Sequence, residues 1–277
     1  FRSASILFVP AGKTLPAVVY AADFNGYVYA VNARTGAALW QKFVGTIPFL
    51  HFVTGGMQHH DGKLFVPVSS KEVLATVIIP GPCCRSHGML VALDAATGEV
   101  LWNYHTTGEA LESALPGERI GPNGATVWAT PTVDSKRNAI YIGTGQNYTE
   151  PATNTSDAII SLDMDTGAVN WVFQARQADT WNGNCGNTES LRCPRPAGHD
   201  FDFGAAPILL DDGNTLIAGD KGGVVYSIQA QSGALNWSNK VSLGSTLGGI
   251  HWGMAVDRRR VYVAATDFSI DKASGGV

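Results

Sequence analysis

The sequence predicts an all-β protein: a β-propeller with four-stranded blades, present as an incomplete ring of about four and a half blades. A pattern ending in Gly-x-x-x-Trp occurs four times along the chain. Further pairs of extended runs precede three of these four copies. The composition agrees with this fold class, because 45% hydrophobic residues can form a buried core and 32 glycines spread along the chain suit many turns.

Each copy of the repeat has the sequence pattern of a β-hairpin. Alternating β-branched and aromatic residues meet a polar turn ending in glycine, and a short run carrying the tryptophan follows. The tryptophans are spaced by 62, 69 and 66 residues. The four copies are YVYAVNARTGAALW (27–40), MLVALDAATGEVLW (89–102), AIISLDMDTGAVNW (158–171) and VVYSIQAQSGALNW (224–237).

The runs upstream of the hairpins add two strands to a repeat. They lie within 5–23, 129–145 and 205–220. Four-stranded sheets repeated around an axis form a propeller, with the tryptophan filling the gap between neighbouring blades. The alternative, a solenoid of stacked coils, requires shorter and more uniform repeats.

A fifth unit begins at 252–267, but the chain ends at Val277, where a third strand of that unit is expected. We therefore expect a single propeller domain over 1–277 that is part of a larger propeller. An open sheet edge promotes association, so we expect this chain alone to aggregate or dimerise. The expected blades are about 1–45, 46–107, 125–178, 203–243 and, in part, 249–277.

Charge and hydropathy exclude two classes of partner. The formal net charge is −4, from 19 basic and 23 acidic residues, so we expect no nucleic-acid partner. The longest apolar runs, such as Leu74 to Pro80, are far shorter than the roughly 20 residues of a membrane-spanning helix. We therefore expect no membrane span. No export signal is visible at the start of the chain.

Three segments interrupt the repeats, and function is expected on such loops. They run over 69–87, 107–128 and 179–203, and they contain all four cysteines. The paired spacing of a zinc site is absent. We expect Cys185 and Cys193 to form a disulfide in an exported protein. The adjacent Cys83 and Cys84 form either a strained vicinal disulfide or two free thiols.

The repeats and interruptions together resemble a known family. Blades of the form VALDAATGEVLW resemble those of quinoprotein alcohol dehydrogenases, which hold pyrroloquinoline quinone (PQQ) and usually calcium over the propeller axis. The segments PGPCCRSHGMLVALD, GPNGATVWATPTVD and CPRPAGHDFDFGAAPIL are similar to the polyvinyl alcohol dehydrogenase branch. The similarity covers nearly the whole chain.

The resemblance implies roles for three residues outside the cysteine pair. Trp128 matches the tryptophan on which the quinone stacks, although a core tryptophan is the alternative. Asn147 matches the asparagine whose carbonyl oxygen binds calcium, and a turn asparagine is the alternative. Lys221 matches the basic residue that hydrogen-bonds the quinone oxygens, although its Gly-Gly context also suits a hairpin turn.

The resemblance also implies a role in cofactor binding for the loop that contains the adjacent cysteines. Cys83 and Cys84 resemble vicinal cysteines that cover the other face of the quinone, and we assign them and the adjacent Arg85 to cofactor binding. Related alcohol dehydrogenases supply a calcium-binding glutamate from this stretch, but here no acidic residue lies between Glu72 and Asp94.

The family's general base is an aspartate in a loop of the form Asp-x-Trp-Asp. The matching segment here is Asp179-Thr-Trp-Asn182, and an amide cannot accept the alcohol proton. We rank Asp179 first as the catalytic base because of its adjacency, with Asp200 and Asp202 as alternatives.

The resemblance implies an enzyme that transfers hydride from an alcohol, polyvinyl alcohol or a similar secondary alcohol, to PQQ. Electrons would pass to a cytochrome c, for which this chain carries no Cys-x-x-Cys-His haem motif. The implied location is the periplasm or the exterior. The alternative function is a non-catalytic propeller that serves as an assembly scaffold in the bacterial envelope.

Overall fold

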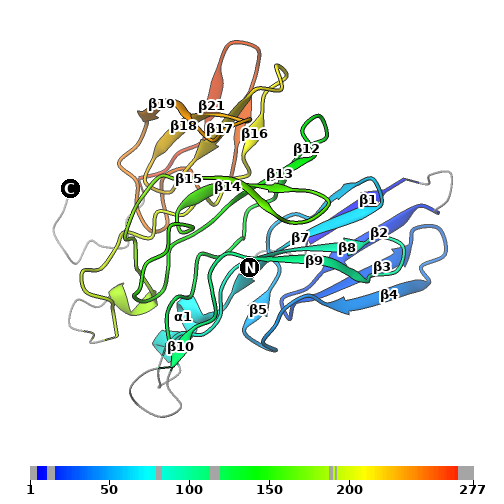
Figure 1. Cartoon of the computed structure of the whole chain (residues 1–277), viewed down its shortest axis with the longest axis horizontal. Helices are drawn as coiled ribbons and strands as arrows, with labels where there is room; N and C mark the ends of the chain where they lie inside the picture. Colours follow the sequence, from blue (N-terminus) through cyan, green and yellow to red (C-terminus); the bar gives the residue numbers. More distant parts are fainter. Residues whose placement is uncertain are drawn as a thin grey trace.

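The computed structural model describes residues 5–10, 16–78, 83–112, 119–186, 190 and 192–267. Its strands form antiparallel sheets that follow one another along the chain, which confirms the predicted all-β fold class. Figure 1 shows these sheets arranged in an arc, from β1–β4 at the right to β16–β19 at the top.

The first sheet consists of β1 (Ser5–Val9), β2 (Val18–Ala22), β3 (Tyr27–Asn32) and β4 (Ala38–Phe43). The second has the order β5-β7-β8-β9, with β6 also pairing with β7. Its strands are β5 (His51–Phe52), β6 (Gln58–His60), β7 (Lys63–Ser70), β8 (Met89–Asp94) and β9 (Val100–His105).

The third and fourth sheets each have four strands in sequential order. They comprise β12 (Thr132–Asp134), β13 (Ala139–Gly143), β14 (Ala158–Asp163) and β15 (Val169–Gln174), then β16 (Ile208–Leu209), β17 (Thr215–Gly219), β18 (Val224–Gln229) and β19 (Leu235–Lys240). A further pair, β20 (Met254–Val256) and β21 (Val261–Val263), occupies the fifth unit.

The hydrophobic core is divided into clusters that lie between consecutive sheets. One cluster joins the first and second sheets, another the second and third, and a third the third and fourth. A smaller cluster joins the fourth sheet to β20 and β21. Each sheet therefore buries its faces against its neighbours, as propeller blades do.

The repeated tryptophans lie between these sheets, as the sequence predicts. Trp40, Trp102 and Trp171 each donate an indole N–H hydrogen bond of 3.1 Å to a main-chain carbonyl in the β-turn of the next sheet. Trp237 occupies the same position in the fourth sheet but is 46% exposed. The Gly-x-x-x-Trp repeat is thus the contact between blades.

The interruptions contain short elements that the repeat pattern does not predict. Helix α1 (Glu72–Ile78) lies in the first, and Ser70 caps its start by accepting a hydrogen bond from the Glu72 main-chain N–H. The ribbon β10 (Leu111–Glu112) and β11 (Arg119–Ile120) lies in the second. The 3₁₀ turn η1 (Gly183–Gly186) of the third contacts α1.

Candidate functional site

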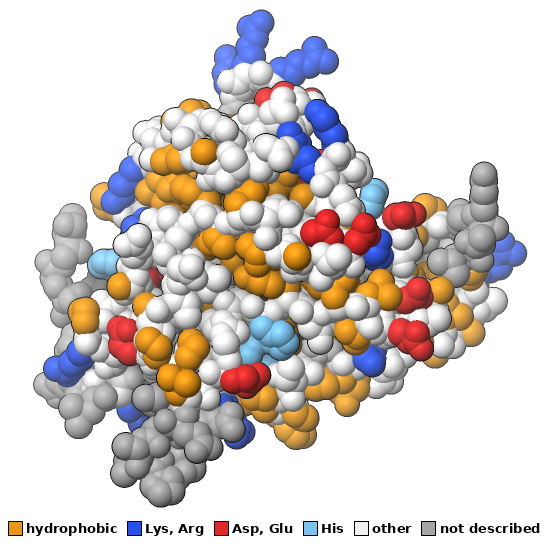
Figure 2. All heavy atoms as spheres, viewed as in Figure 1, with side chains coloured by type: hydrophobic (Ala, Val, Ile, Leu, Met, Phe, Trp, Pro, Cys, Tyr) orange, Lys and Arg blue, Asp and Glu red, His pale blue; other side chains and the backbone are white. Residues whose placement is uncertain are grey.

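A cavity of about 450 Å³ is lined mostly by residues of the loops that flank the strands, together with residues of β5, β7 and α1. Its lining is mainly apolar, with a buried charged group on one side. On the face drawn in Figure 2, hydrophobic side chains gather over the middle and most Lys and Arg side chains lie toward the margins. The residues that line the cavity are Phe24, Phe52, Thr54, Ser69, Ser70, Val73, Leu74, Thr126, Trp128, Gln146, Tyr148, Trp181, Asp200, Asp202, Lys221, Thr246, Leu247 and His251.

Trp128 forms a flat wall of this cavity. Its indole lies directly against the main chain of Gly204, where a Cβ atom would collide with the ring. Its Nε1 donates a hydrogen bond of 3.0 Å to Oδ2 of Asp202. The ring is partly exposed to the cavity, so it offers a fixed aromatic face to a flat ligand.

Asp200, Asp202 and Lys221 form the charged group. Nζ of Lys221 lies 2.9 Å from Oδ2 of Asp200 and 3.3 Å from Oδ2 of Asp202. Burial alone would lower the pKa of Lys221, but the two carboxylates outweigh it and raise that pKa above its usual value. Lys221 therefore stays an ammonium group. Its Nζ also lies 5.9 Å from the centre of the Trp128 ring.

The structure thus brings Trp128 and Lys221 together, but it places Asn147 elsewhere. Asn147 is fully buried and is not among the residues that line the cavity. Its Oδ1 accepts hydrogen bonds from the N–H of Thr153 at 2.8 Å and from its hydroxyl at 3.2 Å. Its Nδ2 donates to the carbonyl of Asn123. The neighbouring Gln146, which the sequence analysis did not single out, lines the cavity instead.

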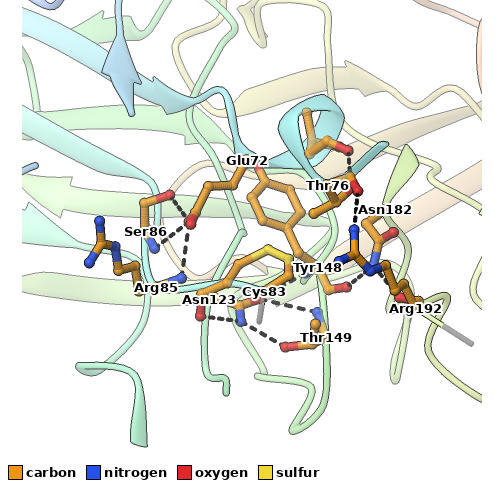
Figure 3. The surroundings of a disulfide bond; sticks show 12 residues. Glu72, Thr76, Cys83, Arg85, Ser86, Asn123, Tyr148, Thr149, Asn182 and Arg192 are labelled. Atoms are coloured by element: carbon orange, nitrogen blue, oxygen red, sulfur yellow. Dashed lines mark hydrogen bonds between the residues drawn. A yellow bond between two sulfur atoms is a disulfide. The ribbon is translucent and has the colours of Figure 1, made fainter. Parts of the chain in front are cut away.

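Cys83 and Cys84 are joined by a disulfide, so the free-thiol alternative is wrong. Neither they nor Arg85 are among the residues that line the cavity. Figure 3 shows the Glu72 carboxylate accepting hydrogen bonds from the main-chain N–H groups of Arg85 and Ser86. The exposed position of the Arg85 side chain argues against its contact with a cofactor, and contact of Cys83 and Cys84 with a cofactor stays a prediction.

The second predicted disulfide, Cys185–Cys193, is also present. It closes the part of the third interruption that follows Asn182. Asn182 is buried, and its Nδ2 donates to the carbonyls of Tyr148 and Arg192. Asn182 therefore connects this loop to its surroundings.

Asp179, ranked first as the base, is not among the residues that line the cavity. Its Oδ1 accepts hydrogen bonds from the main-chain N–H of His199 at 2.9 Å and of Asp200 at 3.4 Å. Its carboxylate also packs against Gly198, where a Cβ atom would collide with it. The geometry therefore assigns Asp179 to holding the loop, whereas the two alternatives, Asp200 and Asp202, do line the cavity.

Of the two non-protein groups that the resemblance implies, PQQ fits the residues of this site and calcium at Asn147 does not. A flat aromatic wall beside a buried ammonium suits a planar, oxygen-rich cofactor such as PQQ. Calcium at Asn147 does not fit, because Thr153 already occupies the amide oxygen. Over the described residues, no group of three or more His, Cys, Asp or Glu side chains is arranged to hold a metal.

Comparison with known proteins identifies the family. Residues 7–191 match the family model of the β-propeller domain of PQQ-dependent glucose, ethanol and alcohol dehydrogenases. The chain therefore belongs to this family of quinoprotein propellers, as the resemblance implied.

Two relatives that match nearly the whole of this chain are polyvinylalcohol dehydrogenases. The chain is 38% identical over 274 residues to a polyvinylalcohol dehydrogenase of Sphingopyxis sp. (strain 113P3), and the match covers 95% of this chain and 42% of the relative. It is 36% identical over 273 residues to a polyvinylalcohol dehydrogenase of Pseudomonas sp., covering 96% of this chain and 42% of the relative. The chain thus spans less than half the length of these relatives.

A solved structure supports the fold. A europium-containing methanol dehydrogenase superposes with a TM-score of 0.61 at 20% sequence identity, covering 84% of this chain and 41% of that one. At this identity the likeness shows the fold alone. No helix among the described residues is long and apolar enough to cross a membrane.

Proposed function

We propose that this chain forms the cofactor-binding part of a PQQ-dependent dehydrogenase that oxidises polyvinyl alcohol or a similar secondary alcohol. The observation that carries the proposal is the convergence of Trp128, Asp202 and Lys221 in one cavity. The names of the two relatives, which match nearly the whole of this chain, support the substrate class.

Trp128 and Lys221 would hold the cofactor. The indole face offers a stacking surface, and its hydrogen bond to Asp202 fixes the ring. The Lys221 ammonium would donate hydrogen bonds to quinone oxygens, where negative charge develops during reduction. When bound, PQQ would supply the site that accepts hydride from the carbinol carbon.

Asp202 is the base that this geometry supports best. Trp128 Nε1 and Lys221 Nζ contact its Oδ2, and the Gln146 main-chain N–H donates to its Oδ1 at 3.1 Å. These contacts orient the carboxylate beside the cavity. Asp202 would take the hydroxyl proton of the alcohol while the hydride leaves the carbinol carbon, so that a carbonyl product forms.

The remaining parts of the proposal concern the whole protein. Electrons would leave the reduced cofactor for a cytochrome c, and the protein would act in the periplasm or outside the cell. Both statements extend to this chain what its resemblance to quinoprotein alcohol dehydrogenases implies. Calcium is not used in the proposed steps, because the residues around Asn147 do not fit it.

The test uses the full-length protein loaded with PQQ and measures dye reduction with secondary alcohols. Asp202→Asn should lower kcat by about 100-fold or more, the usual contribution of a general base, while cofactor absorbance is retained. Asp212→Asn, at an exposed turn, is the matched control. A kcat for Asp202→Asn within about threefold of wild type would refute the role of Asp202. Absence of both cofactor absorbance and dye reduction in the wild type would favour the scaffold function.

A further inference from the structure

Three apolar side chains that line the cavity are also exposed to solvent. Phe24, Leu74 and Leu247 are 53%, 64% and 46% exposed. The charged residues of the same lining are buried, since Asp202 is 6% and Lys221 is 4% exposed. Phe24, Leu74 and Leu247 therefore form the mouth of the cavity, and the charged group lies at its floor.

The mouth is assembled from three separate segments of the chain. Phe24 lies in the turn between β2 and β3, Leu74 in α1, and Leu247 in the loop between β19 and β20. The Phe24 ring packs against the Phe52 ring with their centroids 4.5 Å apart. Nζ of Lys71 lies 4.9 Å from the centre of the Phe24 ring. These contacts fix one wall of the mouth before any ligand binds.

Helix α1 continues the apolar surface beyond the mouth. Ile78 follows Leu74 by four residues, so the two side chains lie on the same side of the helix, and Ile78 is 81% exposed. The helix itself is held in place by its contact with η1. Nη1 of Arg192 also donates a hydrogen bond of 3.0 Å to the Thr76 carbonyl (Figure 3). Leu74 and Ile78 are thus presented to solvent by an anchored helix.

The lining of the cavity suits an uncharged chain that carries hydroxyl groups. Among the described residues that line it, Asp, Glu, Lys and Arg side chains are confined to the charged group, in which they pair with one another. The rest is apolar or offers neutral hydrogen-bonding groups, such as Thr54, Ser69 and Thr246. A polymer cannot enter a cavity of about 450 Å³ as a whole. If one of its carbinols reacts at the floor, its flanking segments must pass through the mouth.

We propose that the mouth and Ile78 bind the carbon-chain segments that flank the reacting carbinol of a polymeric alcohol. This inference rests on the proposed function, because it names the residues by which the site favours a polymer over a small secondary alcohol. Exposed apolar side chains contribute binding free energy when a substrate chain covers them. A small alcohol held at Asp202 has no chain that could cover them.

The test compares two substrates of the full-length protein loaded with PQQ. It measures kcat/KM for polyvinyl alcohol and for 2-propanol, and isothermal titration calorimetry measures binding of polyvinyl alcohol to the same proteins without PQQ. The variants are Leu74→Gln and Ile78→Gln, because glutamine removes the apolar surface and keeps a good helix former. Leu39→Gln is the matched control, since Leu39 is 46% exposed on β4 and is not among the residues that line the cavity.

We expect each helix variant to lower the ratio of the two kcat/KM values, polymer over 2-propanol, by about fivefold or more. Leu39→Gln should leave this ratio within about twofold of the wild type. Binding of polyvinyl alcohol in the calorimeter should weaken in the helix variants and not in the control. Loss of polymer binding in these variants would support the mouth even if the wild type oxidised neither alcohol, a result that would refute the proposed function alone.

Three results would overturn the proposal. In the first, the helix variants leave both the ratio and polymer binding as in the wild type. In the second, they do so while lowering the unfolding temperature, which would show that another part of the full-length protein covers Leu74 and Ile78. In the third, sedimentation velocity shows a wild-type dimer that the helix variants dissociate while the ratio stays unchanged, which would assign the surface to self-association.

Discussion

Replacement of Gly167 by alanine tests whether tryptophan contacts hold the blades together. Gly167 lies in the turn after β14 with φ of +71°, and an added Cβ would lie 2.6 Å from Cε3 of the Trp102 indole. That indole is only 9% exposed and is hydrogen-bonded to the Met164 carbonyl, so it has little freedom to move aside.

The expected magnitude has two parts. A left-handed backbone costs a residue with a Cβ about 1 kcal/mol. Overpacking against a fixed side chain costs about 1–3 kcal/mol more. Gly167→Ala should therefore lower the free energy of unfolding by about 2–4 kcal/mol.

Gly36 provides the matched control. It occupies the equivalent turn of the first sheet with φ of +73°, but nothing lies within 4 Å of its added Cβ. Gly36→Ala should cost only the backbone part, about 1 kcal/mol. The assay is urea unfolding followed by circular dichroism. Equal losses for Gly167→Ala and Gly36→Ala would show that the tryptophan contact contributes nothing to stability.

Three further predictions concern pH, a disulfide and the cofactor. Burial lowers the pKa of His51 to about 4 in the folded chain. Between pH 6.5 and 4 the unfolded chain therefore binds a proton at His51 that the folded chain does not bind. The free energy of unfolding falls as the pH is lowered through this range. His51→Asn should remove about 3 kcal/mol of that pH dependence, as measured by urea unfolding at several pH values; identical slopes would refute it. Replacing Cys185 and Cys193 together by serine should lower the free energy of unfolding by about 2–3 kcal/mol through lost loop closure, and an unchanged urea midpoint would contradict this. Arg85→Ala should change PQQ affinity by less than about twofold in a fluorescence titration, because the side chain is exposed outside the cavity; a tenfold loss would restore Arg85 to the cofactor site.

The fold could be predicted because its signals are local. The run ending at Trp171 contains strand alternation, turn and docking tryptophan within fourteen residues, and β14 and β15 form there. The contact with the next sheet follows from repetition, because the indole of Trp171 meets the turn at Ala230 just as Trp102 meets Met164. Helix α1 lies in a loop that does not repeat along the chain, so the repeat pattern could not predict it.

The candidate site could be predicted only in part. Trp128 and Lys221 were identified from the resemblance, and the structure places both at the cavity. Asp179 was chosen because it precedes Trp181 in sequence, but its carboxylate turns toward main-chain N–H groups of His199 and Asp200. Which aspartate faces the cavity depends on how the loop folds back, and adjacency in sequence carries no information about that.

The geometry nevertheless explains why Asp179 matters to the charged group. By accepting the N–H groups of His199 and Asp200, it holds a turn in which Asp200 adopts φ of +60°, a conformation that a non-glycine residue rarely keeps without support. From that turn Asp200 and Asp202, two residues apart, both reach the Lys221 ammonium. Asp179 thus fixes the loop. Asp200 and Asp202 share the ammonium group of Lys221, which lies in the turn between β17 and β18. The Asp-x-Asp spacing alone therefore does not predict the charged group, because the group forms only when the fold brings Lys221 against both carboxylates.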